Sequence, residues 1–309
     1  MLCQASCGVS AYCAEDVVMI LIYYQSKSEG SIVLNIDEQK LIEIARAAAA
    51  AILDVYTQDF EVQSKTDASP LTQADLAAHE VIVSGLQALT PERPIISEES
   101  EPPGFSVRSS WSEYWLVDPL DGTKEFVNRN GEFTVNIALI RDGQPAWGIV
   151  VLPVHDRIYI GDVAAGLARC IDQDGEHAIK GRQMQLHRAG YDIVASRSHG
   201  SQRSENYLDE LGRRLGPLNR KAVGSSLKLC ALADGEADCY PRLGPTSEWD
   251  IGAAHAVLKA AGGEVYTFDR TPLAYNSKES LLNPEFVAVA DAAFDWWSVL
   301  PAQPSPDEE

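Results

Sequence analysis

The stretch Tyr114-Trp115-Leu116-Val117-Asp118-Pro119-Leu120-Asp121-Gly122-Thr123 joins an apolar run to two aspartates. The run 114–117 predicts a strand that is buried on both faces and ends at the acidic residues. A buried strand that delivers Asp118 and Asp121 to one corner demands a compensating cation, because an unpaired charge is costly away from water. Asp-Pro-Leu-Asp-Gly is also a good turn sequence, so a simple turn remains an alternative.

Two further acidic groups fall where the chain is expected to change direction. Glu98 and Glu99 follow a predicted strand, and Asp250 lies at the start of a predicted helix. Because α/β folds gather binding groups at strand ends and helix starts, we expect these carboxylates to meet Asp118 and Asp121. Hard oxygen ligands of this kind are the ones that Mg²⁺ prefers.

Each of these acidic groups also has an ordinary structural interpretation. Thr72-x-x-Asp75 and Ser247-x-x-Asp250 both fit helix capping boxes. Glu98 and Glu99 fit a solvated surface pair. The combination of the groups, rather than any one of them, favours a metal site.

Away from this corner the chain shows alternating helical and strand patterns. Asp37 is expected to cap the first helix, and Arg-Asp-Gly-Gln at 141–144 resembles a hairpin turn. The predicted helices span 38–56, 71–89, 201–215, 225–233 and 250–261. The predicted strands span 60–63, 94–96, 114–117, 133–141, 146–152, 157–161, 191–195, 239–241 and 263–268.

These patterns predict an α/β (α+β) protein with a mixed first sheet and a second α/β lobe. The acidic, proline-rich end of the chain is expected to be disordered. The predicted organisation is an N-terminal extension at 1–36, a metal-binding α+β lobe at 37–185, a substrate-binding α/β lobe at 186–300 and a disordered tail at 301–309.

The composition excludes several classes of function. The 309 residues include 45 acidic and 25 basic ones, for a formal charge of −20, which argues against binding a nucleic-acid polymer. Six cysteines form no C-x-x-C pair, as expected for unconnected, reduced thiols. The apolar run 17–24 is far shorter than the ~20 residues that span a bilayer, so no transmembrane segment or signal peptide is expected.

Two signatures carry a family resemblance. The segment 115–123, followed later by Trp249-Asp250, resembles the inositol monophosphatase superfamily of Mg²⁺-dependent, lithium-sensitive phosphatases. Within that superfamily the chain is most similar to the bacterial 3′(2′),5′-bisphosphate nucleotidases, and the resemblance covers about residues 38–290. The segments that carry this likeness are 65–75, 124–136, 196–199, 224–228 and 240–242, of which the run through DGTKEF and RNGEFTVN is the most specific.

The resemblance implies a layered α-β-α-β-α sugar-phosphatase-like fold, with two lobes around a site for two to three Mg²⁺ ions. It assigns Glu98, Asp118 and the Leu120 carbonyl to one metal, and Asp118, Asp121 and Asp250 to another. Asp75 and Thr123 would orient and deprotonate the attacking water. The backbone N–H groups after Asp121, those of Gly122 and Thr123, would contact phosphate oxygens, and the metal ligands Glu98, Leu120, Asp121 and Asp250 would also adjoin the substrate.

The resemblance places the nucleotide on the second lobe. Ser225 and Lys228, at a predicted helix start, would hold the 5′-phosphate. Arg242 would add a bidentate phosphate contact, and His199 would contact the adenine or ribose. A lone loop histidine is more often structural, and Ser225 is also an acceptable helix cap, so these alternatives stay open. Ile251 stands where related enzymes commonly carry threonine or proline, a difference that leaves Asp250 intact.

The implied activity is hydrolysis of 3′-phosphoadenosine 5′-phosphate to AMP and phosphate, with 3′-phosphoadenosine 5′-phosphosulfate as a second substrate. One alternative is an inositol monophosphatase or another sugar-phosphate phosphatase with the same metal site. A second alternative is a catalytically silent protein that binds a nucleotide or metal. The resemblance further implies a monomer or homodimer in the bacterial cytoplasm, including the inner face of the inner membrane.

Overall fold

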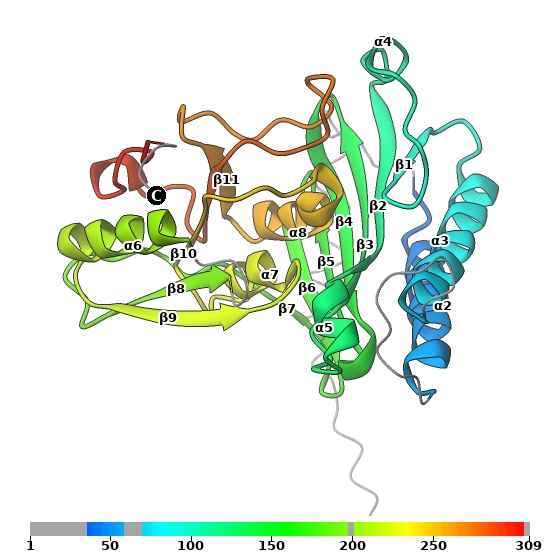
Figure 1. Cartoon of the computed structure of the whole chain (residues 1–309), viewed down its shortest axis with the longest axis horizontal. Coiled ribbons are helices and arrows are strands. Elements are labelled where there is room, and N and C mark those ends of the chain that lie inside the picture. Colours follow the sequence, from blue (N-terminus) through cyan, green and yellow to red (C-terminus); the bar gives the residue numbers. More distant parts are fainter. Residues whose placement is uncertain (1–35, 59–69, 197–200, 306–309) are drawn as a thin grey trace, which may run out of the picture. The chain divides into compact units, whose positions relative to one another are not determined.

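In the computed structural model, residues 37–309 form one compact unit. This unit carries the elements described below (Figure 1). The structure describes residues 36–58, 70–196 and 201–305. The predicted strand at 60–63 and the predicted substrate residue His199 lie outside these ranges.

The first sheet has seven strands in the order of the sequence. β1 runs parallel to β2, and every later pair is antiparallel. Asp142 and Gly143 both have positive φ, 49° and 70°, in the two-residue turn between β3 and β4, which confirms the predicted hairpin. The strands are β1 Ile95–Ser97, β2 Glu113–Asp121, β3 Thr134–Arg141, β4 Gln144–Leu152, β5 Arg157–Asp162, β6 Leu167–Asp172 and β7 Gly175–Ala178.

The second sheet has five strands in the order β11-β12-β10-β8-β9. β8 pairs in parallel with β9 and β10, whereas β12 is antiparallel to both of its neighbours. This sheet is therefore mixed, as an α/β lobe would be. Its strands are β8 Tyr191–Ser196, β9 Leu218–Val223, β10 Cys239–Arg242, β11 Glu264–Thr267 and β12 Phe286–Val289.

Helices form three layers around the two sheets (Figure 1). α2 (Glu38–Tyr56) and α3 (Pro70–Leu89) cover the outer face of the first sheet. α7 (Leu227–Ala233) and α8 (Glu248–Ala260) share one apolar core with both sheets. α6 (Gln202–Leu215) packs on the other face of the second sheet. The expected α-β-α-β-α layering is thereby confirmed; two short helices, α4 (Phe105–Arg108) and α5 (Thr123–Val127), follow β1 and β2.

α8 lies unusually close to the first sheet because two strand residues are glycine. A Cβ at Gly148 would come within 2.4 Å of the Ala253 carbonyl oxygen, and one at Gly161 within 2.5 Å of the Val257 Cα. Any larger residue at these positions would push the helix outward. The two glycines therefore set how near α8, which carries Asp250, approaches the strands.

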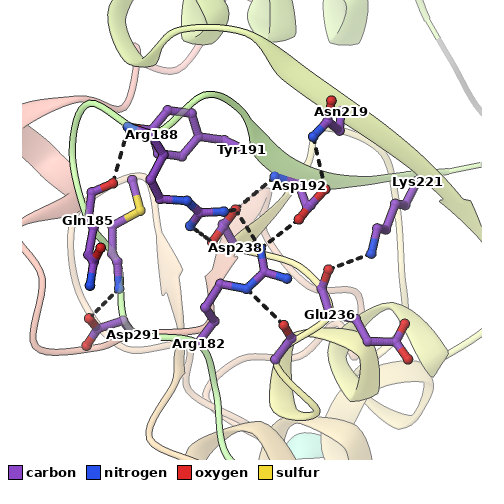
Figure 2. A network of polar contacts seen from close by, with 12 residues as sticks. Arg182, Gln185, Arg188, Tyr191, Asp192, Asn219, Lys221, Glu236, Asp238 and Asp291 are labelled. Atoms are coloured by element: carbon purple, nitrogen blue, oxygen red, sulfur yellow. Dashed lines mark hydrogen bonds and ion pairs between the residues drawn. The ribbon is translucent and has the colours of Figure 1, made fainter.

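The connection between the two sheets is held by a network of charged side chains (Figure 2). Asp238 accepts hydrogen bonds from both terminal nitrogens of Arg188, at 2.7 and 3.2 Å, and from the backbone N–H of Asp192 at 2.8 Å. Arg182 donates to the Asp192 carboxylate at 2.6 Å and to the Gly235 carbonyl at 2.9 Å. Two arginines from the connecting segment thus neutralise two aspartates of the second sheet.

The observed boundaries match the predicted ones where the hydrophobic pattern extends over many residues, and they differ where that pattern is short. The helix at 38–56 is confirmed, with the Asp37 carboxylate accepting a hydrogen bond from the Lys40 N–H at 3.1 Å. The predicted helix at 225–233 begins two residues later, because Ser225 adopts φ 49° and Ser226 is the N-cap. Four strands were not predicted, namely β6, β7, β9 and β12. The sequences of the first three are polar or very short, so they show no clear strand pattern.

Candidate active site

β2 does not end at the first aspartate but continues through Asp121 as a bulged strand. Asp118 pairs with Asn136 and Asp121 with Thr134, so three steps on β2 face two on β3. The Asp118 carboxylate accepts a hydrogen bond from the Leu120 N–H at 3.0 Å, which stabilises the extra residue. The predicted strand end at 117 and the simple-turn interpretation are therefore wrong, although the chain does bend at Gly122 (φ 101°).

Three of the predicted carboxylates come together from three different elements. Oxygen atoms of Glu98, Asp118 and Asp250 all lie within 4.8 Å of one another. Glu98 follows β1, where its N–H donates to the Val117 carbonyl at 3.1 Å, and Asp250 lies in the first turn of α8. The Asp250 carboxylate also accepts a hydrogen bond from the Ser247 N–H at 2.8 Å. The capping interpretation and the cluster interpretation of Asp250 are thus both correct.

Asp121 faces a different partner from the other three carboxylates. Its Oδ2 accepts a hydrogen bond from the Ser225 hydroxyl at 2.6 Å. The Asp121 charge nevertheless raises the pKa of both Asp118 and Asp250, after the effect of burial. Asp121 therefore lies between the acidic cluster and the residues expected to hold the substrate.

Burial and mutual repulsion raise the pKa values of these carboxyl groups. The pKa of Asp118 lies well above its usual range because the group is buried, and next because Asp121, Glu98 and Asp250 surround it. Burial and Asp121 raise the pKa of Asp250 to about 7. Within the described residues, no lysine or arginine forms an ion pair with Asp118, Asp121 or Asp250. A cation from outside the chain would remove this repulsion.

Asp75 and Thr123 approach the same corner from two helices. Asp75 lies on α3, and its charge contributes to the raised pKa of Asp118, after burial and the three nearer carboxylates. One turn later on α3, the His79 Nδ1 is 2.9 Å from the Ser97 hydroxyl at the end of β1. Thr123 is the first residue of α5. Because α3 begins at Pro70, Asp75 lies inside the helix, and the capping-box alternative for Thr72-x-x-Asp75 is wrong.

A cleft of about 330 Å³ joins the acidic cluster to the second sheet. Of the residues that the sequence predicted for the site, Asp75 does not line this cleft and His199 lies outside the described residues. The predicted residues that line it are Glu98, Asp118, Leu120, Asp121, Gly122, Thr123, Ser225, Lys228, Arg242 and Asp250.

The two basic residues that line the cleft beside the second sheet are held in place by backbone carbonyl groups. The Lys228 ammonium donates to the Ser225 carbonyl at 2.8 Å and lies 5.9 Å from the centre of the Tyr240 ring. Burial lowers its pKa, and the Asp121 charge partly opposes that effect. Arg242 donates to the carbonyls of Gly244 and Pro245 at 3.2 and 2.8 Å. These two cations make the cleft wall opposite the carboxylates favourable for an anion.

Sequence reasoning missed a buried hydroxyl network behind Ser225. The Thr134 hydroxyl lies 2.5 Å from the Ser225 hydroxyl and 2.9 Å from that of Ser226. Ser226 in turn donates to the Asn136 amide oxygen at 2.8 Å. These bonds hold Ser225 in a left-handed conformation that L-residues rarely adopt. Thr134, Asn136 and Ser226 lie in quoted motifs, but nothing in their spacing indicates that β3 and the loop before α7 meet.

The sequence profile of the inositol monophosphatase family matches residues 36–294. The chain belongs to the inositol monophosphatase family. The match begins one residue before the first helix cap, and it includes both sheets and the whole acidic cluster.

Two curated relatives share the greater part of the family region. The 3′(2′),5′-bisphosphate nucleotidase CysQ of Escherichia coli K12 is 48% identical over 250 residues, which covers 80% of this chain and 97% of that protein. The protein of the same name from Buchnera aphidicola is 40% identical over 258 residues, covering 81% and 92%.

Solved structures support the same grouping. CysQ from Bacteroides thetaiotaomicron, described as a bacterial member of the inositol monophosphatase family, superposes with a TM-score of 0.75 at 38% identity, covering 84% of this chain and 99% of that one. An inositol monophosphatase from Zymomonas mobilis, at 22% identity, shares the fold with a TM-score of 0.68, covering 84% and 95%. Among the described residues, no helix is long and apolar enough to cross a membrane.

Proposed function

We propose that the chain is a Mg²⁺-dependent 3′(2′),5′-bisphosphate nucleotidase that hydrolyses 3′-phosphoadenosine 5′-phosphate to AMP and phosphate, and also accepts 3′-phosphoadenosine 5′-phosphosulfate. The observation that carries the proposal is the cleft that joins a cluster of three carboxylates to Lys228 and Arg242. The likeness to the CysQ nucleotidases supports the substrate class.

The donor set fits Mg²⁺. Every side chain of the cluster offers carboxylate oxygen, and a hard cation prefers that donor. Glu98, Asp118, Asp121 and Asp250, together with the Leu120 carbonyl, would hold two to three ions. When bound, these ions neutralise negative charge on the phosphate and lower the pKa of a coordinated water.

The remaining chemistry falls to protein groups. Asp75 would accept a proton from the attacking water through the Thr123 hydroxyl, since a carboxylate paired with a hydroxyl is an effective base arrangement. The N–H groups of Gly122 and Thr123 would orient the phosphate for in-line attack on phosphorus. The carboxylates prevent an anionic substrate from entering until cations are present, so metal binding would precede substrate binding.

The 5′-phosphate would lie against the second sheet's side of the cleft. Lys228 and Ser225 are already joined by the bond between the lysine ammonium and the serine carbonyl, so both would meet the same phosphate. Arg242 would add a charge-assisted contact through N–H groups other than those bonded to the loop carbonyls. His199 remains a proposed contact to the adenine or ribose, and the cytoplasmic location and the monomeric or dimeric state remain predictions.

Phosphate release from 3′-phosphoadenosine 5′-phosphate and from inositol 1-phosphate, with Mg²⁺ titrated, tests the activity. We expect hydrolysis to require Mg²⁺ and to favour the nucleotide. A much faster rate on the inositol ester would identify the chain as an inositol monophosphatase instead. Binding of the nucleotide without any phosphate release would favour the catalytically silent alternative.

The 5′-phosphate contact can be tested separately by comparing Lys228→Ala with Lys221→Ala. Lys221 is a half-buried lysine on β9 whose ammonium contacts the Glu236 carbonyl. Lys228→Ala should raise KM about 10- to 100-fold for the bisphosphate and much less for adenosine 3′-phosphate, which lacks the second phosphate. Lys221→Ala should leave both unchanged. An effect confined to kcat, or equal on both substrates, would contradict the role of Lys228.

A further inference from the structure

A second group of metal-ligating side chains lies on the β6–β7 hairpin, outside the catalytic cleft. The Cys170 thiol, an Asp172 carboxylate oxygen and a His177 ring nitrogen all lie within 4.8 Å of one another. Cys170 and His177 are directly opposite across the antiparallel pair, and Asp172 is two residues beyond Cys170. All three side chains therefore project from the same face of the hairpin.

The face that carries these side chains is half enclosed. Cys170 is buried in the core shared with α7, whereas His177 is exposed. The Tyr159 hydroxyl on β5 reaches the Asp234 carboxylate, just beyond α7, at 3.5 Å. Asp234 is near enough for its charge to help raise the pKa of Cys170, after burial and Asp172. An ion could therefore enter from the solvent on the His177 side and find the sulfur at the inner end.

Arg157 is the cation that now pairs with this group. Its guanidinium lies 3.3 Å from the Asp172 carboxylate and 3.3 Å from the Tyr159 hydroxyl. The Arg157 side chain is 39% exposed, so it can rotate into solvent without leaving a buried charge. A metal ion at the hairpin would replace Arg157 as the partner of Asp172.

We propose that Cys170, Asp172 and His177 bind one zinc-class transition-metal ion, with water or Asp234 in the fourth position. Sulfur and imidazole ligands select Zn²⁺ over Mg²⁺, which prefers the all-oxygen cluster of the cleft. Ligand atoms of a tetrahedral zinc site are about 3.5 Å apart. The three ligand atoms lie within 4.8 Å of one another, so no pair has to approach by more than about 1.3 Å. The Cys170 thiol and Asp172 carboxylate, 3.9 Å apart, are already close to that spacing.

Binding releases one proton, because the metal takes the thiolate. Burial, Asp172 and Asp234 raise the pKa of Cys170 to about 12, so the thiol is protonated at neutral pH. The Cys170 sulfur exchanges its proton for the metal, and the proton passes to the solvent.

Cobalt titration of the full-length protein in excess Mg²⁺ tests the site. Co²⁺ bound to a thiolate gives a near-ultraviolet sulfur-to-metal charge-transfer absorption, which the sulfur-free catalytic cleft cannot produce. We expect this absorption to saturate at one Co²⁺ per chain and to decrease when Zn²⁺ is added. Its absence at neutral and alkaline pH would overturn the proposal.

Matched variants assign the ligands. Cys170→Ser should abolish the absorption, and His177→Asn should weaken Co²⁺ binding at least about tenfold. His187→Asn, a second exposed histidine, and a triple Cys3→Ser, Cys7→Ser, Cys13→Ser variant should both bind as the wild type does. His177 is exposed, so its variant should fold even if Cys170→Ser does not. Unchanged binding by His177→Asn, or loss of the absorption in the triple variant, would refute the assignment.

Discussion

Asp118 and Asp238 are equally buried, each 1% exposed, but their surroundings are opposite. Asp238 accepts two hydrogen bonds from Arg188 and one from a backbone N–H. Asp118 accepts one backbone N–H and otherwise faces Glu98, Asp121 and Asp250. Burial of a carboxylate does not by itself indicate a site. What distinguishes Asp118 is that, among the described residues, its charged neighbours are carboxylates, whereas Asp238 lies against an arginine.

The two regions also differ in the direction in which their carboxyl pKa values are shifted. The hydrogen bond from Arg182 lowers the pKa of Asp192, and the hydrogen bond to Asp238 raises the pKa of Arg188. These ion pairs need no ion from outside the chain, so we call them the self-sufficient network. In the cleft the carboxyl pKa values are raised. The charges of the arginine–aspartate network are balanced within the chain, whereas bound cations would balance those of the proposed metal site.

The largest effect is expected from a substitution at Asp121. Asp121→Asn keeps the bulk of the side chain but removes charge from the proposed metal site, so phosphate release should fall about 1,000-fold or more. The matched control is Asp192→Asn, which removes a carboxylate from the self-sufficient network and should leave kcat near the wild-type value. Activity assays of both variants at saturating Mg²⁺ provide the measurement. Near-normal turnover by Asp121→Asn would mean that the proposed metal site is misplaced.

The self-sufficient network should show its effect in stability rather than in catalysis. Arg188→Met leaves the buried Asp238 carboxylate short of its main partner and should lower the free energy of unfolding by about 2–3 kcal/mol. Arg220→Met removes an arginine that pairs with Glu205 and Asp209 at the surface, and should cost less than about 1 kcal/mol.

Urea denaturation of the two arginine variants measures these values. Equal losses would show that the Asp238 network is no more important than an ordinary surface pair. A loss of kcat in Arg188→Met at a temperature where the protein stays folded would show that the two regions are coupled.

Without metal, the contributions of the two regions to folding stability should depend on pH in opposite directions. Asp118 and Asp250 have folded-state pKa values above those of the unfolded chain, so their protonated forms favour folding. The stabilising effect of protonated Asp250 is fully present below about pH 4 and is lost as the pH rises through about 7, its folded pKa. The raised pKa of Asp118 acts in the same direction. Asp192, with a lowered pKa, contributes stability that is instead lost as the pH falls.

Melting temperatures in EDTA and in Mg²⁺, measured between about pH 5 and about pH 8, test this sign. Mg²⁺ should stabilise the protein more at the alkaline end of the range. Asp250→Asn should flatten the difference, whereas Asp192→Asn should preserve it. A larger Mg²⁺ effect at acidic pH would contradict the proposed origin of the raised pKa values.

The smallest effect is expected at the hydroxyl network between the two halves of the cleft. Thr134→Val removes the hydroxyl that contacts Ser225 and Ser226, and should lower kcat/KM by up to about tenfold, in line with one hydrogen bond. Thr267→Val removes an exposed hydroxyl that contacts Thr271 and should change nothing. Full activity in Thr134→Val would show that Ser225 keeps its conformation without this support.

Most of the layered fold could be predicted because its long helices have a clear period. The helix at 38–56 combines an aspartate cap with a continuous apolar stripe, and both of its ends were predicted. β9 could not be predicted, because Leu-Asn-Arg-Lys-Ala-Val has no apolar alternation and forms a strand only beside β8. The acidic corner was predicted as a strand end because Asp, Pro and Gly also favour turns, while pairing with β3 extends the strand.

The candidate site divides in the same way. Motifs indicated which carboxylates belong together, and Glu98, Asp118 and Asp250 do meet. The sequence could not indicate that Asp121 would contact Ser225, since that bond depends on how the loop before α7 lies against β3. Contacts between elements far apart in the chain leave no local pattern to detect.

The close packing of α8 on Gly148 and Gly161 also bears on when the site forms during synthesis. Asp118 leaves the ribosome long before Asp250, and α8 can dock on β4 and β5 only after the whole first sheet exists. Pairings of such high sequence separation are slow and form late in folding. The nascent chain would therefore expose an incomplete carboxylate set, and the proposed magnesium binding would begin only when α8 is in place.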